Sequence, residues 1–320
     1  MKLGIAVVYL VKEGDEGLLD LHLSQIARCT HVPYTCYAAV NRLAPHLRAR
    51  LARAPRTRIV DIRTTAQRGT EEHAYYLEWL VKTAVQDGVT HVATLHIDSF
   101  PVRDGWAEDL ASRLTGKCVL AAVTREEVGD LKPHPSLMFF HRDFYLASKP
   151  SFLLGRSCRS SPEYRRYRAE YGAAEDTGIG YGFDIFRQEL SWYRLLRTNR
   201  VEDHYAMAGI YGDLVFHLGA ATRGHQVFYS DAIPAGTSQT MRSVLRFGRR
   251  CLSALPQAWQ DRIIRGAFPA HQVNAAIQVD IKKKLLADPD AYIRRLRTGL
   301  PEATPEPVLR GGDLASPSAR

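Results

Sequence analysis

Short apolar runs alternate with segments of helical character through the first hundred residues. Runs typical of buried strands, with β-branched and aromatic residues, occupy 4–11, 34–40, 57–63 and 90–96. The spacing of apolar positions predicts helices between them at 18–26, 46–53 and 70–86. Strands that alternate with helices indicate an α/β fold: a mostly parallel sheet with helices on both of its faces.

The pattern becomes less regular after the fourth strand. Further strands are predicted at 119–123, 137–141 and 215–218. The segment 155–175 is polar and rich in Arg, Ser and Tyr, which is typical of a loop or lid. Trp79 and Trp192 are predicted to pack in the core.

The chain changes character after Pro234. Basic amphipathic helices are predicted at 238–253, 257–267 and 271–298, and a tail rich in Pro, Gly, Ala and Ser follows. The predicted organisation is an α/β domain over 1–235, a helical appendage over 236–300 and a disordered tail over 301–320.

Composition narrows the class of protein. Of the 320 residues, 45% are hydrophobic and 24% are charged, as in soluble globular proteins. No apolar run approaches the roughly 18 residues that a membrane-spanning helix needs, so we expect a cytoplasmic protein. The five cysteines are scattered without a Cys-x-x-Cys pair, which argues against a disulfide scaffold or a zinc knuckle.

The net charge of +9 belongs mainly to one segment. Within 236–300, Lys and Arg outnumber Asp and Glu by 12 to 4, whereas 1–235 is nearly balanced. The main domain is therefore not expected to bind nucleic acid. The basic segment 236–300 could contact an anionic membrane surface or a second copy of the chain, although an apolar stripe that packs on the main domain is the simpler interpretation.

The most informative polar residues follow the fourth predicted strand. Ligands of open α/β sheets bind beyond the carboxyl ends of the strands, and Asp98 lies at such an end, before Pro101. A carboxylate there can hold Mg²⁺ or Mn²⁺ against a diphosphate. It can equally cap the turn into the next helix.

Two later stretches offer further candidate chemistry. His217 lies in an apolar strand that leads through a Gly-rich turn to Arg223, so an imidazole could reach a metal and a guanidinium a phosphate. A hydrogen-bonded core histidine is the alternative. Glu175 and Asp176 precede a turn of small residues, where a carboxylate can cap a helix or serve as a general base. His134, in a Pro-rich stretch read as a loop, could line the same pocket.

Together these features resemble bacterial family-2-type glycosyltransferases of the GT-A fold, over roughly residues 3–235. The resemblance rests on His96-Ile97-Asp98, followed by Phe100-Pro101 and Gly105-Trp106. The family has an Asp-x-Asp motif at this place, often followed by a hydrophobic-Pro turn and a Gly-Trp pair.

The resemblance implies an inverting transfer of a sugar from a UDP-, GDP- or dTDP-linked donor to a hydroxyl of a small-molecule or glycan acceptor. It implies that Asp98 and His217 hold manganese or magnesium (Mn²⁺ or Mg²⁺), and that Asp176 is the general base. Asp61 and Arg68 are expected to hold the nucleoside.

One residue departs from the family pattern. His96 replaces the first acid of the motif, and its imidazole is expected to hydrogen-bond a ribose hydroxyl of the donor.

Two other functions remain open from the sequence. A nucleotidyltransferase could use a similar sheet, but its Gly-rich basic signature is missing from the acidic stretch 11–17. A non-enzymatic scaffold or nucleic-acid-binding protein could use the basic segment 236–300.

Overall fold

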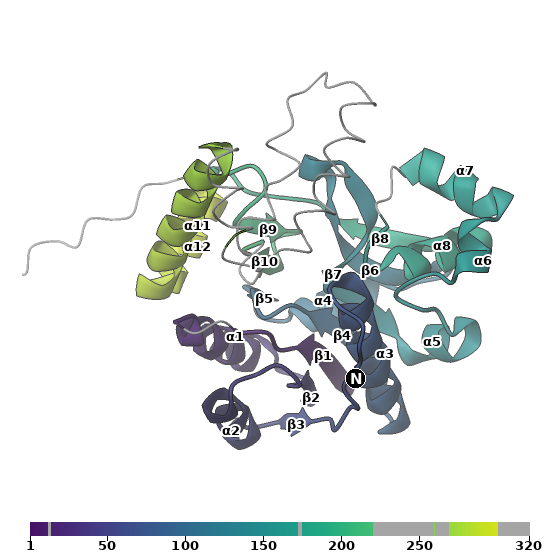
Figure 1. The fold of residues 1–320 in the computed structure, drawn as a ribbon, viewed down its shortest axis with the longest axis horizontal. Coiled ribbons are helices and arrows are strands. Elements are labelled where there is room, and N and C mark those ends of the chain that lie inside the picture. Colours follow the sequence, from purple (N-terminus) through teal and green to yellow (C-terminus); the bar gives the residue numbers. More distant parts are fainter. Residues whose placement is uncertain (12–13, 172–174, 220–258, 260–268, 300–320) are drawn as a thin grey trace, which may run out of the picture.

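A seven-stranded sheet forms the centre of the computed structural model, which describes residues 1–11, 14–171, 175–219, 259 and 269–299 (Figure 1). The strand order is β3-β2-β1-β4-β7-β6-β8, and only β7 runs antiparallel to its neighbours. The strands are β1 (Leu3–Val8), β2 (Tyr34–Ala39), β3 (Thr57–Ile59), β4 (His91–Leu95), β6 (Cys118–Arg125), β7 (Asp130–His141) and β8 (Ser191–Leu195). The predicted α/β class and mostly parallel sheet are confirmed.

Helices cover both faces of this sheet because its central strands are apolar on both sides. In β1, Ile5 and Val7 pack with α1 (Glu16–Cys29), α2 (Pro45–Arg53) and α4 (Trp106–Arg113). Ala6 points the other way, into the cluster that holds α3 (Thr70–Gln86), α5 (Arg142–Ser148) and α8 (Ile179–Arg187). The domain therefore has three layers.

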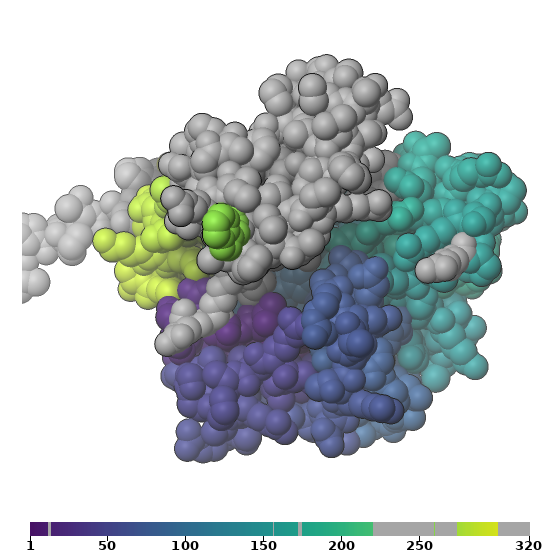
Figure 2. Space-filling model, in the orientation of Figure 1, coloured from purple at the N-terminus to yellow at the C-terminus, as the bar shows by residue number. Residues whose placement is uncertain are grey.

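A second sheet of three short strands lies beside the first. It consists of β5 (Ser99–Pro101), β10 (Val215–His217) and β9 (Gly209–Tyr211), all antiparallel. Its apolar side packs against α1, α11 (Pro269–Ala287) and α12 (Pro289–Thr298). Figure 2 shows the yellow surface of these last helices against the purple N-terminal part.

The two C-terminal helices match the predicted helical stretch 271–298, although α11 begins two residues earlier, at Pro269. Tyr292, Ile293 and Leu296 of α12 are buried in this contact, as expected of a docking helix. The predicted helices at 238–253 and 257–267, and the tail over 301–320, lie outside the described residues apart from Trp259. Within the described part, no helix combines the length and apolarity that crossing a membrane requires.

Three sequence interpretations were wrong. The polar segment 155–175 contains α6 (Arg156–Arg159) and α7 (Pro162–Tyr171), because Tyr164 and Tyr167 recur at helical spacing and pack on Phe183 of α8. Trp79 is 43% exposed, with the Lys82 ammonium 5.0 Å from its ring centre.

The stretch 132–136, read as a loop, belongs to β7. The short 3-10 helix η1 (Glu126–Val128) joins β6 to this strand. Strands β5, β8 and β9 were not predicted, because two have three residues and β8 lies at an edge with mostly exposed side chains.

Candidate active site

The turn after β4 holds Asp98 in a fixed position. Ser99 ties the turn to β7, since its hydroxyl donates to the Ser136 carbonyl (2.6 Å) and accepts from the His96 amide (2.8 Å). The Leu218 amide donates to the carbonyl of Asp98 itself (2.9 Å). Asp98 does not cap the next helix, because α4 begins after Gly105 with no side-chain cap.

His217 lies beside Asp98 because β10 pairs with β5. The antiparallel register sets His217 opposite Ser99, which places its Nε2 3.8 Å from Asp98 Oδ1. Both residues are buried, His217 at 4% exposure and Asp98 at 5%. Burial lowers the pKa of His217 to about 4, and the nearby Asp98 carboxylate opposes that shift. The imidazole is therefore neutral at pH 7, which is the form that binds metals.

His96 completes a group of three possible metal ligands. Its Nδ1 lies 4.0 Å from Asp98 Oδ1, and one ligand atom from each of His96, Asp98 and His217 lies within 4.8 Å of the others. Two imidazoles and one carboxylate form a donor set that suits a divalent cation. The residues present therefore fit a metal-binding role.

Four imidazoles gather at this end of the sheet. The ring centre of His96 lies 5.0 Å from that of His73, 5.5 Å from His134 and 5.7 Å from His217. His134 comes from β7, and its Nδ1 accepts a hydrogen bond from the Ser136 amide (3.2 Å). Burial and the neighbouring Lys132 ammonium lower the pKa of His134, so this imidazole is also neutral.

Asp176 is connected to the same cluster through the start of α3. Its Oδ1 accepts from the Thr70 hydroxyl (2.9 Å) and from the Thr177 amide (2.7 Å). The Thr177 hydroxyl lies 3.3 Å from Nδ1 of His73, which contacts His96. Asp176 is half-buried and is not the N-cap of α8, a position that Gly178 occupies.

The small residues after Asp176 allow its turn to approach two backbone segments. A Cβ on Gly178 would lie 2.3 Å from the Pro133 carbonyl oxygen, and one on Gly180 would lie 2.0 Å from that of Ser151. Gly178 also has a φ of +98°, which favours glycine. This close packing fixes the Asp176 turn against β7, which carries His134.

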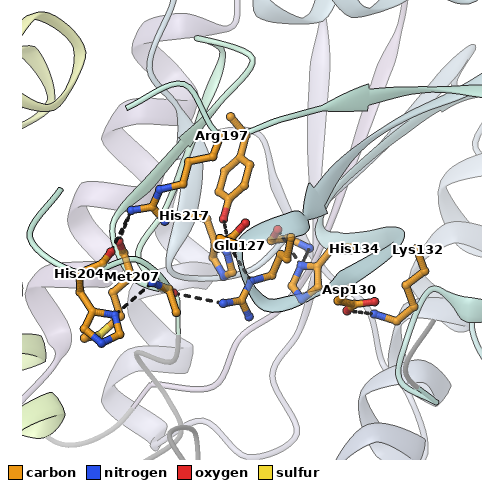
Figure 3. Close-up of polar contacts among 12 residues, drawn as sticks. Glu127, Asp130, Lys132, His134, Arg197, His204, Met207 and His217 are labelled. Atoms are coloured by element: carbon orange, nitrogen blue, oxygen red, sulfur yellow. Dashed lines mark hydrogen bonds and ion pairs between the residues drawn. The ribbon is translucent and has the colours of Figure 1, made fainter. Parts of the chain in front are cut away.

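Sequence reasoning missed a buried polar network around His217. Figure 3 shows Glu127 drawn with His217 and His134, with Arg197 on one side and the Asp130–Lys132 pair on the other. Glu127 Oε1 accepts from the Tyr211 hydroxyl (2.7 Å). The fully buried Lys132 donates to Asp130 (2.5 Å). The signal was the concentration of charged residues from Arg125 to Lys132, of which only Lys132 belonged to a stretch read as a loop.

Two guanidinium groups in this network support the segment before β9. Arg197 donates to the carbonyls of His204 (3.0 Å) and Met207 (2.8 Å), and Arg125 donates to that of Ala206 (3.1 Å). Both cations also help to lower the pKa of His217, after the larger effect of burial. The two guanidinium groups therefore lie close to the three-ligand group, together with the Glu127 carboxylate, which opposes their effect on His217.

The residues expected to hold a nucleoside lie on the exposed segment between β3 and α3. Asp61 and Arg68 are both exposed, and Arg68 donates to the carbonyls of Thr65 (3.1 Å) and Gln67 (2.8 Å). This segment leads into the α3 N-terminus, where Thr70 binds Asp176. The hydrogen bonds of Arg68 are local to this segment, so neither Asp61 nor Arg68 belongs to the histidine cluster, and Arg223 lies outside the described residues.

Comparison with known proteins finds similarity only at the level of structure. No protein-family model and no curated protein sequence matches the chain. Mouse xyloside xylosyltransferase 1 in its apo form is 10% identical, with a TM-score of 0.40 over 61% of this chain and 85% of that one. A putative nucleotide-diphospho-sugar transferase from Desulfovibrio desulfuricans is 11% identical, with a TM-score of 0.37 over 61% and 79%.

A third similar structure is the 1–349 fragment of S. aureus TarS in complex with UDP-GlcNAc. It is 10% identical, with a TM-score of 0.35, and the match covers 48% of each chain. TM-scores this low assign no residue roles. The chemistry of the site therefore has to be inferred from the residues of this chain.

Proposed function

We propose that the protein is a glycosyltransferase that moves a sugar from a nucleoside-diphosphate donor to an acceptor hydroxyl with inversion. The observation that supports this most is the meeting of His96, Asp98 and His217 at the carboxyl end of β4. Ligands of open α/β sheets bind at this edge. The half-buried carboxylate of Asp176 is linked to the same place through Thr70, Thr177 and His73.

A metal at Asp98 and His217 would supply charge for the leaving group. As the bond from the sugar's anomeric carbon to oxygen breaks, negative charge grows on the diphosphate, and a divalent cation stabilises it. The resemblance in sequence suggests Mn²⁺ or Mg²⁺ for this role. Arg223 is our candidate for a second cation on the phosphates.

Asp176 is suited to accept the acceptor's proton. A sugar or alcohol hydroxyl titrates far above pH 7, so it needs a base within hydrogen-bond reach. Thr70 and the Thr177 amide both bind Asp176 Oδ1, which holds the carboxylate in one orientation. A single displacement by the activated hydroxyl inverts the anomeric carbon and needs no covalent enzyme intermediate.

The exposed Asp61 and Arg68 are candidates for nucleoside contact. They lie on a segment that enters the same edge of the sheet, and their side chains are open to solvent. A carboxylate can accept from base or ribose donors, and a guanidinium can stack on or bind a base. UDP, GDP and dTDP donors all remain candidates, and so do small-molecule and glycan acceptors.

Donor turnover by Asp176→Asn tests the proposal, with Glu175→Gln as its matched control. Glu175 is an adjacent exposed acid that pairs with Arg159 and Arg168. We expect Asp176→Asn to lower turnover by about 10²- to 10⁴-fold while nucleotide binding persists, and the control to stay near wild type. Full turnover by Asp176→Asn would refute the base assignment. Release of pyrophosphate instead of a nucleoside diphosphate would identify a nucleotidyltransferase.

A further inference from the structure

We infer that His96 is a metal ligand and that the site formed with Asp98 and His217 selects imidazole-binding divalent metals of the zinc type over Mg²⁺ and Mn²⁺. This inference rests on the proposed function only for the use of the metal; the binding itself follows from the side chains. It differs in two ways from what the resemblance in sequence implies, in which His96 touches a ribose and the metal is Mn²⁺ or Mg²⁺.

The donor atoms point to this class of metal. Imidazole nitrogen suits Zn²⁺, Fe²⁺, Ni²⁺ and Cu²⁺, whereas Mg²⁺ and Mn²⁺ favour carboxylate, carbonyl and water oxygens. The group has two imidazoles and a single carboxylate, Asp98. His96 stands where the resembled family has an acid. The histidine changes the set of metal ligands from oxygen-rich to nitrogen-rich, and this change disfavours Mg²⁺.

The geometry allows all three side chains to bind one ion. Ligands bonded at about 2.0 to 2.2 Å lie roughly 3 to 4 Å apart around an ion. The distances from Asp98 Oδ1 are 3.8 Å to His217 and 4.0 Å to His96, and the group spans at most 4.8 Å. Side-chain movements of about 1 Å would close this set around an ion. Three protein ligands leave at least one position open, and a diphosphate oxygen can occupy it.

The surroundings hold the ligands in place before a metal arrives. Asp98 and His217 come from strands joined by the β5–β10 pairing, and the His96 amide is bound by Ser99. His134 contacts the rings of both His96 and His217. Because these contacts limit the side chains to small movements, other donors cannot readily replace the two imidazoles, and the site keeps its donor preference.

Metal binding to the full-length chain, stripped of metal and free of a polyhistidine tag, tests the inference without any assay of turnover. Nearly all sites with nitrogen and oxygen ligands bind Zn²⁺ more tightly than Mn²⁺, so tighter binding of Zn²⁺ by the wild type would not by itself support the inference. The informative quantity is the ratio of Zn²⁺ to Mn²⁺ affinity, measured by competition with a fluorescent chelator. We expect His96→Asp to lower this ratio at least about ten-fold.

His46→Asp is the matched control, because His46 is an exposed histidine at the start of α2. The ratio of Zn²⁺ to Mn²⁺ affinity in His46→Asp should equal that of the wild type. An unchanged ratio in His96→Asp would overturn the inference.

A second measurement needs no variant and covers the case in which His96→Asp does not fold. The chain has 12 histidines. On titration with Zn²⁺, nitrogen-detected NMR of labelled imidazoles should show one equivalent of metal shifting two of them together. One shifted imidazole, or none, would contradict the assignment of His96.

The metal inference and the proposed function fail in different ways. In one outcome, Zn²⁺ binds through two imidazoles but no nucleoside diphosphate stabilises the metal-loaded chain. This result would support the metal inference and refute the proposed glycosyltransferase function. Nucleoside-diphosphate binding with an unchanged metal ratio in His96→Asp would refute only the metal inference.

Discussion

Glu78 offers a quantitative test of how the Asp176 turn is supported. This α3 residue accepts from the Phe152 amide through Oε1 (2.5 Å), and the Phe152 carbonyl accepts from Gly178 (2.9 Å) beside Asp176. Burial raises the pKa of Glu78 from 4.5 to about 7, and the Phe152 hydrogen bond opposes the shift. The folded protein therefore favours the neutral form of this carboxyl group at pH values where an exposed glutamate is ionised.

The size of the effect follows from that shift. Each pKa unit corresponds to about 1.4 kcal/mol, so a rise of roughly 2.5 units costs about 3 kcal/mol of stability once the group must be ionised. Because the folded pKa is raised, Glu78 contributes full stability below about pH 4.5 and loses it as the pH rises through 7. Glu78→Gln removes this loss, since the amide mimics the neutral carboxyl group.

Chemical denaturation at pH 5 and pH 8 measures the prediction. Glu78→Gln should match wild type within about 1 kcal/mol at pH 5 and exceed it by about 2 to 3 kcal/mol at pH 8. Glu71→Gln, an exposed glutamate on the same helix, should change stability by less than about 0.5 kcal/mol at both values. An equal gain at the two pH values, or no gain at pH 8, would refute the account of Glu78.

Other predictions concern packing around the site. Gly180→Ala should lower the free energy of unfolding by about 1 to 3 kcal/mol, since its Cβ meets the Ser151 carbonyl oxygen, whereas Gly155→Ala, with open space around it, should have little effect. Urea denaturation distinguishes them, and equal effects would contradict the close approach. Leu296→Ala should cost about 2 to 5 kcal/mol, because Leu296 is fully buried between α12 and the small sheet. An unchanged midpoint in the same assay would show that α12 does not support the domain.

Much of the large sheet could be predicted from periodicity. The helix predicted at 70–86 is α3. The first four strands lie within the predicted runs, except that β1 begins one residue earlier, at Leu3. These elements have long apolar patterns, which local sequence reports well. The pairing of β5 with β10 has no such signal, because each strand has only three residues.

The candidate site depends on that pairing. It brings His217 to Asp98, which are 119 positions apart, so the sequence alone could suggest their meeting only through the family resemblance. His96 was assigned a ribose contact because the resemblance offers an acid at its position. Its distance from Asp98 became clear only in three dimensions. Lys132 was placed in a loop because a lysine is rarely fully buried in a strand unless it is paired. Its partner, Asp130, lies two residues away in the same strand.

Ligand-induced stabilisation is the most direct test of the claim that this site binds a nucleoside diphosphate. The thermal midpoint of the metal-loaded chain is measured with UDP, GDP and dTDP up to millimolar concentration. At least one should stabilise the wild type, by about 2.7 kcal/mol at 100 times its dissociation constant, and Asp98→Asn should lose most of this gain. No shift with any of the three, or an equal shift in Asp98→Asn, would contradict the assignment of this site.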